Sequence, residues 1–272
     1  MNLEGRIANW VELGVMPYNE VMEIQRKLVE MRKKDLIGDT VLSVQHPLTV
    51  SFGADEKNNQ FSEELLRRVA ERYGSHSPQH IERYLMDNRI PFDRTSRGGG
   101  ATVFAPGQFL FYPIVDHMQV TGSHQFDVGA YKLKIYETMF GSLANLGVNG
   151  IKTGSSEAFR TRDERRDVWT NRDGVTHKMG SKGIALNGNV AYNGFALYVD
   201  ESGIANNWMV NQCGYTPEQV RLWSVEQELG RKIHPDEVYN ATKKSIIQNF
   251  GYSALQENTL IKPKVMEGIY GS

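Results

Sequence analysis

The sequence has one cysteine, Cys213, in 272 residues. A single cysteine excludes an internal disulfide and a multi-cysteine metal cluster, and a lone thiol suits a reducing compartment. No apolar run approaches the roughly 18 residues that a membrane span requires. Residues Met1–Trp10 also lack the apolar segment of a secretory signal. We therefore expect a cytoplasmic protein with no membrane partner and no metal.

Excess charge is also missing. Lys and Arg total 31 against 32 Asp and Glu, which gives a net charge of -1. Dedicated nucleic-acid binders are usually far more basic, so we expect no nucleic-acid partner. The content of 40% hydrophobic and 23% charged residues is that of an ordinary globular chain. A chain of this length can bury one sizeable core without disulfide or metal support.

The order of elements predicts the α+β class. Apolar residues three or four apart indicate helices, and Asn187-Gly188 within an alternating run indicates a hairpin with a tight turn. Helices and hairpins in this mixture favour mixed or antiparallel sheets with flanking helices over a parallel doubly wound sheet. The predicted helices are Tyr18–Lys33, Ser62–Tyr73, Val128–Leu146 and Pro235–Phe250, and the predicted strands are Thr40–Val50, Phe109–Val115 and a hairpin within Gly183–Asp200.

Two glycine-rich segments are candidates for ligand contact. The first comprises Arg97, Gly98, Gly99, Gly100, Ala101 and Thr102. Its glycines let backbone N–H groups approach a ligand and its arginine adds a fixed cation, but a plain turn explains it equally well. The second comprises Lys178, Met179, Gly180, Ser181, Lys182 and Gly183. Taken alone, it is also compatible with an exposed loop that carries two solvated lysines.

Cys213 stands before Gly214, where a thiol can be approached closely. A lone cysteine can be an inert buried side chain, or a nucleophile if a base or cation lies beside it. None of the seven histidines stands in a recognisable Cys/His catalytic signature or at a zinc-ligand spacing. The stretch 160–172 interleaves Arg160, Arg162, Arg165 and Arg166 with Asp163, Glu164 and Asp167. It reads either as a solvated loop or as a landing site for an acidic partner.

Taken together, these segments resemble the octanoyltransferases (lipoyl/octanoyl-protein transferases) of lipoate biosynthesis. That family has an Arg-Gly-Gly-x-x-Thr run followed by Pro-Gly-Gln, here Arg97–Thr102 and Pro106–Gln108. The resemblance continues, in chain order, through Lys178–Gly183, the Gly194-Phe195-Ala196-Leu197 end of the hairpin, and Cys213-Gly214, and upstream it includes the helix after Pro17-Tyr18 and His46-Pro47. It covers roughly residues 17–230.

The chain departs from the family at two positions. Phe104 and Asn193 stand where the family usually has histidines near its acyl pocket. The segment 154–177 is also longer and more charged than is usual there. These differences indicate a divergent member.

The resemblance implies one catalytic domain over residues 1–272, with the α+β fold of biotin and lipoate protein ligases and a helical extension from about residue 231. It implies transfer of an octanoyl group from octanoyl-acyl carrier protein to a lysine of lipoyl domains. The acceptors would be the 2-oxoacid dehydrogenase complexes and the glycine cleavage H protein. No cofactor is required, because exchange of one thioester for another and then for an amide is downhill.

The family's site residues transfer position by position. Cys213 would carry the acyl group, and Lys178 would lower the pKa of that thiol below its ordinary value of about 8.5. Backbone N–H groups near Ser181–Gly183 and Gly214 would bind the oxyanion. The substrate pocket would be lined by Arg97, Gly98, Gly99, Gly100, Ala101, Thr102, Val103, Phe104, Ser181, Lys182, Gly183, Gly194, Phe195 and Ala196.

Two alternatives remain at this point. An ATP-dependent lipoate–protein ligase shares the fold and also uses a glycine-rich run and a lysine loop, but it needs no cysteine. It usually continues that run with His-Asp, which is absent here. The second alternative is a non-catalytic module that binds acyl carriers, which the two replaced histidines would permit.

Overall fold

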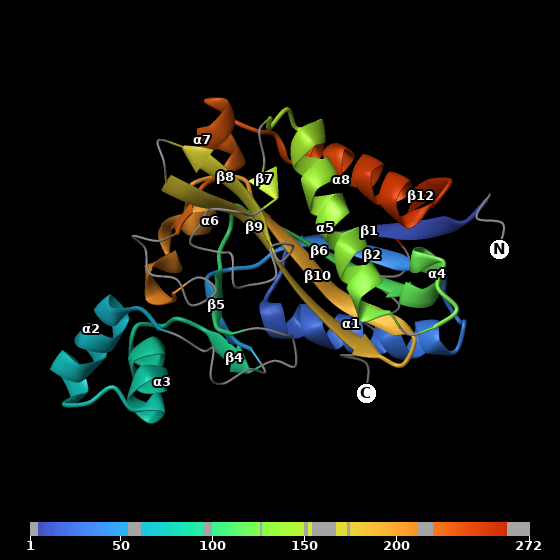
Figure 1. Ribbon diagram of the computed structural model, residues 1–272. Coiled ribbons are helices and arrows are strands. Elements are labelled where there is room, and N and C mark those ends of the chain that lie inside the picture. The colour runs from blue at the N-terminus through green and yellow to red at the C-terminus, as the bar shows by residue number, and fades with distance from the viewer. Residues whose placement is uncertain are drawn as a thin grey trace.

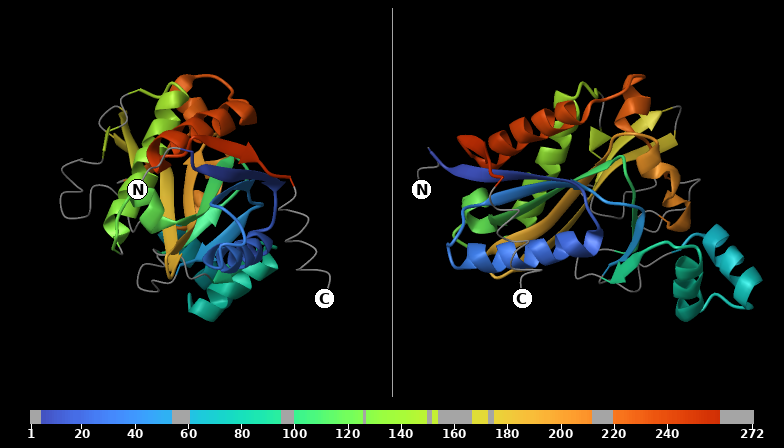
Figure 2. Two further views of the ribbon diagram at one scale, coloured as in Figure 1. Left: turned by 90° about the vertical axis from the view of Figure 1, so that its right-hand side faces the viewer. Right: turned by 180° about the vertical axis from the view of Figure 1, so that it is seen from behind.

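A long mixed β-sheet forms the centre of the computed structural model, with helices on both of its faces (Figures 1 and 2). The structure describes residues 5–53, 61–94, 100–125, 127–149, 152–153, 167–172, 175–211 and 220–259. Within these residues the strand order is β12-β1-β2-β6-β10-β9-β8-β7, and β11 pairs with β9. Parallel and antiparallel pairs both occur, so the expected α+β class with a mixed sheet is confirmed.

The main sheet comprises β1 (Ile7–Val15), β2 (Thr40–Gln45), β6 (Gln108–Asp116), β7 (Lys152–Thr153), β8 (Val168–Arg172), β9 (Val175–Asn187), β10 (Val190–Tyr198), β11 (Arg221–Leu222) and β12 (Ala254–Glu257). A small second sheet has the order β4-β3-β5, from Phe92–Arg94, Thr49–Phe52 and Thr102–Phe104. The longer helices are α1 (Tyr18–Lys33), α2 (Glu63–Tyr73), α3 (Pro78–Asp87), α5 (Val128–Asn145) and α8 (Pro235–Phe250). The short ones are α4 (His117–Thr121), α6 (Ser202–Ala205), the 3-10 helix η3 (Asn207–Met209) and α7 (Val225–Leu229).

Helices α5 and α8 pack against one face of the sheet, and α1 covers the other (Figure 2). Each face has its own apolar core. The α5 side includes Trp10, Phe111 and Met139, all at most 1% exposed. The α1 side includes Leu28 and Leu42, both fully buried. Two covered faces explain why β6 is buried along its whole length.

The α1 helix has the bounds that its apolar spacing predicts. The predicted strand Thr40–Val50 is wrong, because the chain breaks at His46-Pro47 and its two halves enter different sheets. Proline has no N–H to offer a strand ladder, which suits it to this crossing. Ser62, the first residue of the predicted helix Ser62–Tyr73, caps α2 by accepting from the Leu65 N–H at 3.0 Å.

The hairpin of β9 and β10 provides the framework for the site. The hairpin is present as predicted, but its two-residue turn is Gly188-Asn189, one residue beyond the Asn187-Gly188 pair, with Gly188 at φ +61°. Strand β9 extends back to Val175, well before the start of the predicted hairpin, so the segment Lys178–Gly183 is strand and not loop. The loop interpretation of this segment was therefore wrong.

No helix within the described residues is both long and apolar enough to cross a membrane. The same residues contain no cluster of His, Cys, Asp or Glu suited to holding a metal ion.

Candidate active site

A pocket opens beside the start of α1 and is floored by strands of the main sheet. It has a volume of about 480 Å³, counted out to its open mouth. The lining comes from α1, β5, β6, β9 and β10, and consists of Tyr18, Thr102, Phe104, Gln108, Leu110, Tyr112, Ser181, Lys182, Gly183, Asn193, Gly194, Phe195, Ala196 and Tyr198. Parts of the chain that are far apart in sequence therefore meet here: the start of α1, β5 with β6, and the β9–β10 hairpin.

Aromatic rings form the wall nearest to α1. The rings of Tyr18 and Phe104 stack with centroids 5.0 Å apart, and His46 contacts both rings edge-on. His46 is fully buried behind this wall, where its Nδ1 contacts the Met16 carbonyl at 2.7 Å and its Nε2 contacts the Tyr112 hydroxyl at 2.9 Å. Burial lowers the pKa of His46 to about 4, although the hydrogen bond to Met16 opposes this shift. The imidazole is therefore neutral near pH 7, and the wall suits an uncharged chain.

The neutral state fixes the direction of both His46 hydrogen bonds. The Met16 carbonyl can only accept, so Nδ1 carries the proton and donates to it. Nε2 then accepts from the Tyr112 hydroxyl. Sequence reasoning included His46 in the resemblance but gave it no role, because its position next to the pocket arises only when β2, β6 and α1 come together.

Strand β10 passes the pocket with an unusual backbone. Asn193 has φ +58°, and its N–H donates to the buried Gln25 side chain at 2.8 Å. A Cβ at Gly194 would collide with the Phe111 carbonyl and come within 2.7 Å of Pro113 Cδ. Gly194 is thus required by close packing against β6, whatever the pocket binds.

Polar groups at the other end of the pocket are mutually bonded. The hydroxyls of Ser181 and Tyr198 lie 2.5 Å apart. Gln108 donates from Nε2 to the carbonyls of Val103, at 3.0 Å, and Gly203, at 2.5 Å, which fixes the start of β6. Gly107, in the Pro-Gly-Gln run, has φ +92° and its backbone lies against Asp200 and Gly203. This run therefore serves as a structural turn beside the pocket.

Lys178 is 2% exposed and forms an ion pair with Asp167, with Nζ 3.0 Å from Oδ2. The second oxygen of Asp167 accepts the backbone N–H of Lys182 at 3.1 Å. Asp167 is itself 3% exposed, so the interpretation of this acid as part of a solvent-exposed charged stretch was wrong. One buried carboxylate thus joins the Lys178 ammonium to a backbone position in the pocket lining.

Not every predicted residue takes the expected place. Thr102, Phe104, Ser181, Lys182, Gly183, Gly194, Phe195 and Ala196 line the pocket together. Val103 and Ala101, which precedes β5, pack into the core beneath α2 and α3, whereas Thr102 and Phe104 line the pocket. Their contact with substrate stays a prediction. Gly100 is described but is not part of the pocket lining. Arg97, Gly98, Gly99, Cys213, Gly214 and the arginines at 160, 162, 165 and 166 lie outside the described residues.

Comparison with known proteins identifies the class to which this fold and pocket belong. Residues 17–247 match the family described as the lipoyl protein ligase A/B catalytic domain. A bipartite lipoate protein ligase from Thermoplasma acidophilum, from a study of that ligase and its E2 lipoyl domain, superposes with a TM-score of 0.65 at 15% identity. The match covers 98% of this chain and 93% of that one. The chain therefore belongs to the lipoyl protein ligase A/B catalytic domain family, with the fold of the lipoate protein ligases.

Relatives similar in sequence indicate which group of enzymes within this family the chain resembles. An octanoyltransferase from Syntrophobacter fumaroxidans is 29% identical over 236 residues, covering 87% of each chain. One from Rubrobacter xylanophilus is 30% identical over 230 residues, covering 81% of this chain and 83% of the relative. The resemblance to octanoyltransferases is thus confirmed, and the chain is an enzyme of the acyltransferase class.

Proposed function

We propose that this enzyme transfers an octanoyl group from octanoyl-acyl carrier protein to a lysine of a lipoyl domain. The observation that carries the proposal is the pocket itself. An aromatic and aliphatic wall, backed by a neutral histidine, ends at polar residues of β9, and the same strand holds a buried lysine paired with Asp167. Such a pocket suits an uncharged acyl chain attached to a polar reacting group.

The reaction proceeds in two exchanges at one carbonyl carbon. The Cys213 thiolate attacks the carrier thioester and its sulfur bonds to the carbonyl carbon. The bond from that carbon to the carrier sulfur breaks, and the carrier leaves as a thiol with the proton that the Lys178 ammonium gives up. The amine of the acceptor lysine then attacks the new thioester, forming a C–N bond and releasing the Cys213 sulfur. The positive charge of Lys178 favours the thiolate in the first exchange, and its amine form takes a proton from the attacking lysine in the second.

The backbone bonds of β9 bear on the proposed oxyanion donors. The Lys182 N–H already donates to Asp167. Its neighbours Ser181 and Gly183 lie opposite Ala196 and Gly194 in the β9–β10 ladder, where alternate backbone groups bond the next strand. Of the groups named for this role, we therefore propose the Gly214 N–H, which lies outside the described residues, as the oxyanion donor.

Lipoyl domains are proposed as acceptors, those of the 2-oxoacid dehydrogenase complexes and the glycine cleavage H protein. Support comes from the Thermoplasma ligase, whose structural study includes an E2 lipoyl domain. The reducing environment expected from the lone thiol makes the cytoplasm the proposed location.

An ATP-dependent ligase is the second candidate, because solved structures with this fold include lipoate protein ligases, one of them bound with ATP. Two parallel reactions on an isolated lipoyl domain separate the two activities. We expect octanoyl-carrier protein alone to acylate the domain, and free octanoate or lipoate with ATP to leave it unmodified. Product formation only in the ATP reaction would replace the transferase proposal with the ligase. Acylation in neither reaction would leave the non-catalytic carrier-binding module.

A further inference from the structure

Asp167 immediately precedes β8, and β8 pairs with the part of β9 that contains Lys178. In the β8–β9 register Trp169 pairs with Lys178 and Val168 pairs with Gly180, so Met179 is an extra residue on β9. Such a bulge redirects the side chains beside it. Here it accompanies a close pairing of the Asp167 carboxylate with the Lys178 ammonium.

The backbone of Lys178 is fixed on both sides of its strand. On one side it pairs with Trp169 of β8, and on the other it pairs with Leu222 of β11. The Trp223 N–H also donates to the Lys178 carbonyl at 2.9 Å.

Burial makes the charge of Lys178 depend on its partner. An ammonium that is 2% exposed has lost most of its hydration, and without a compensating charge burial favours the neutral amine. The Asp167 carboxylate supplies that compensation at 3.0 Å. The Trp169 ring, whose centroid lies 5.6 Å from Nζ, adds a weaker attraction for the cation.

We propose that Asp167 is a positioning residue for the reaction, which holds Lys178 as an ammonium at a fixed place beside the acyl pocket. This inference rests on the proposed function, in which Lys178 acts on the Cys213 thiol. Asp167 performs the task with both oxygens: Oδ2 binds the ammonium and Oδ1 binds the Lys182 N–H. The lysine and the pocket strand are thereby held in one geometry.

If Asp167 is a positioning residue, its replacement changes turnover and KM to different extents, whereas loss of a purely structural ion pair would change both together. In Asp167→Asn the amide keeps an oxygen for the Lys182 N–H but loses the negative charge. We expect turnover per folded molecule to fall about tenfold to a hundredfold with little change in KM, a part of the 10²- to 10⁴-fold that a positioned proton-transfer group contributes. Asp167→Glu, which restores the charge, should recover part of the loss.

The deciding experiment measures alkylation of Cys213 by iodoacetamide from pH 5 to pH 9, without any acyl substrate. Wild type, Asp167→Asn, Asp167→Glu, Lys178→Ala and Asp39→Asn are compared as full chains. Asp39 is the matched control, because it is a buried carboxylate in ion pairs with Arg6 and Arg32 and precedes β2, which three strands separate from β8 in the main sheet.

We expect Asp167→Asn and Lys178→Ala to lose reactivity at low pH, Asp167→Glu to recover part of it, and Asp39→Asn to resemble wild type. If Lys178→Ala alters the profile and Asp167→Asn does not, the inference is overturned and the proposed function stands. An equal loss in Asp39→Asn would also overturn the inference, because any buried ion pair would then have the effect. If no variant alters the profile, Lys178 does not act on the thiol, and the inference fails together with that part of the mechanism. Absence of transfer from octanoyl-carrier protein with the alkylation pattern intact would count against the proposed function alone.

Discussion

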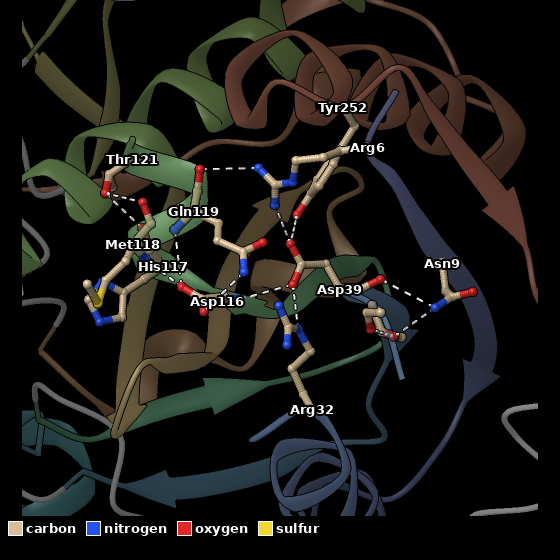
Figure 3. Close-up of polar contacts among 12 residues, drawn as sticks. Arg6, Asn9, Arg32, Asp39, Asp116, His117, Met118, Gln119, Thr121 and Tyr252 are labelled. Atoms are coloured by element: carbon tan, nitrogen blue, oxygen red, sulfur yellow. Dashed lines mark hydrogen bonds and ion pairs between the residues drawn. The ribbon is translucent and has the colours of Figure 1, made fainter. Parts of the chain in front are cut away.

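Two buried carboxylates, Asp39 before β2 and Asp167 before β8, belong to parts of the main sheet that three strands separate, and they are bound in different ways. Figure 3 shows Asp39 between the side chains of Arg6, Arg32 and Tyr252. It accepts from Arg6 at 2.6 Å, Arg32 at 2.8 Å and the Tyr252 hydroxyl at 2.7 Å, and also from the Asp116 N–H at 3.1 Å. Asp167 instead pairs with a lysine and one backbone N–H.

The two sites differ in whether the cation bound to the carboxylate can lose its proton. Arginine does not give up its proton in proteins. Burial opposes the charge of Arg32, but the hydrogen bond and the charge of Asp39 outweigh it and raise the Arg32 pKa above its ordinary value. Asp39 therefore links the start of β1, the end of α1 and Tyr252 after α8 through interactions whose arginine partners stay charged. A lysine beside Asp167 can exchange its proton, so a similar burial produces a site that can take part in chemistry.

Lys178→Ala tests the role of the Asp167–Lys178 pair in the reaction and should have the largest effect. We expect single-turnover octanoyl transfer, measured per folded molecule, to fall about 10²- to 10⁴-fold, since the group that moves the proton is removed. Lys182→Ala is the control for thiol reactivity, because its ammonium lies over the Tyr136 ring, 5.9 Å from the centroid. The alkylation of Cys213 should lose its low-pH reactivity in Lys178→Ala and keep it in Lys182→Ala. The reverse pattern would mean that the two lysines have been assigned the wrong roles.

Asp39→Ala tests the structural role of the Asp39 cluster. It leaves the partly buried Arg6 and the buried Arg32 without their shared carboxylate, so we expect a loss of about 3–5 kcal/mol in the free energy of unfolding. Urea denaturation of wild type and variant measures it. Transfer activity per folded molecule should stay at the wild-type level. A variant that is stable but inactive would show that the Asp39 cluster also serves the reaction.

His46 should make stability depend on pH. Its pKa is about 4 when folded and about 6.5 when unfolded, so between these values the unfolded chain binds more protons. Stability therefore falls as pH decreases from about 6.5 towards 4, by about 3 kcal/mol in total from this one group. Urea midpoints at several pH values should show a shallower slope in His46→Gln. The exposed His76→Gln serves as the control, and equal slopes in both variants would contradict the burial argument.

The smallest effect is expected from the arginines at 165 and 166, which lie outside the described residues. The carrier and the lipoyl domain are proposed to be acidic, and charges at the rim of an interface mainly set the association rate. Reversing both arginines to glutamate should raise KM for the carrier a few-fold and flatten its salt dependence, because salt screens such charges over about 8 Å. Unchanged KM and salt slope for donor and acceptor alike would identify the stretch as a solvated loop.

The sequence predicted the parts of the molecule that local patterns determine. The spacing of apolar residues identified α1, and the Asn-Gly pair located the β9–β10 hairpin. Strand β1 was not predicted, because it carries Asn9 and Glu12 among its apolar residues and owes its place to parallel neighbours on both sides. Parallel partners are distant in sequence and leave no short-range signal.

The pocket residues were predicted from the resemblance to a known family and not from local patterns, and Asp167 was missed. The motifs gave most of the pocket lining, including Phe104 and Ser181, because they could be matched residue by residue to a known family. Asp167 was missed because its neighbours in sequence are charged, and its burial depends on pairing with Lys178 across the β8–β9 bulge. Local composition cannot report a contact that tertiary structure creates.

The central claim is that Cys213 carries the octanoyl group, and intact-mass spectrometry tests it most directly. Wild-type enzyme and Cys213→Ala are each mixed with octanoyl-carrier protein in the absence of an acceptor. We expect wild type to gain the mass of one octanoyl group and the variant to stay unmodified. Adding a lipoyl domain should then remove that mass from the enzyme and place it on the domain. Full transfer activity in Cys213→Ala, or an unmodified wild type that still acylates the domain, would contradict the covalent mechanism.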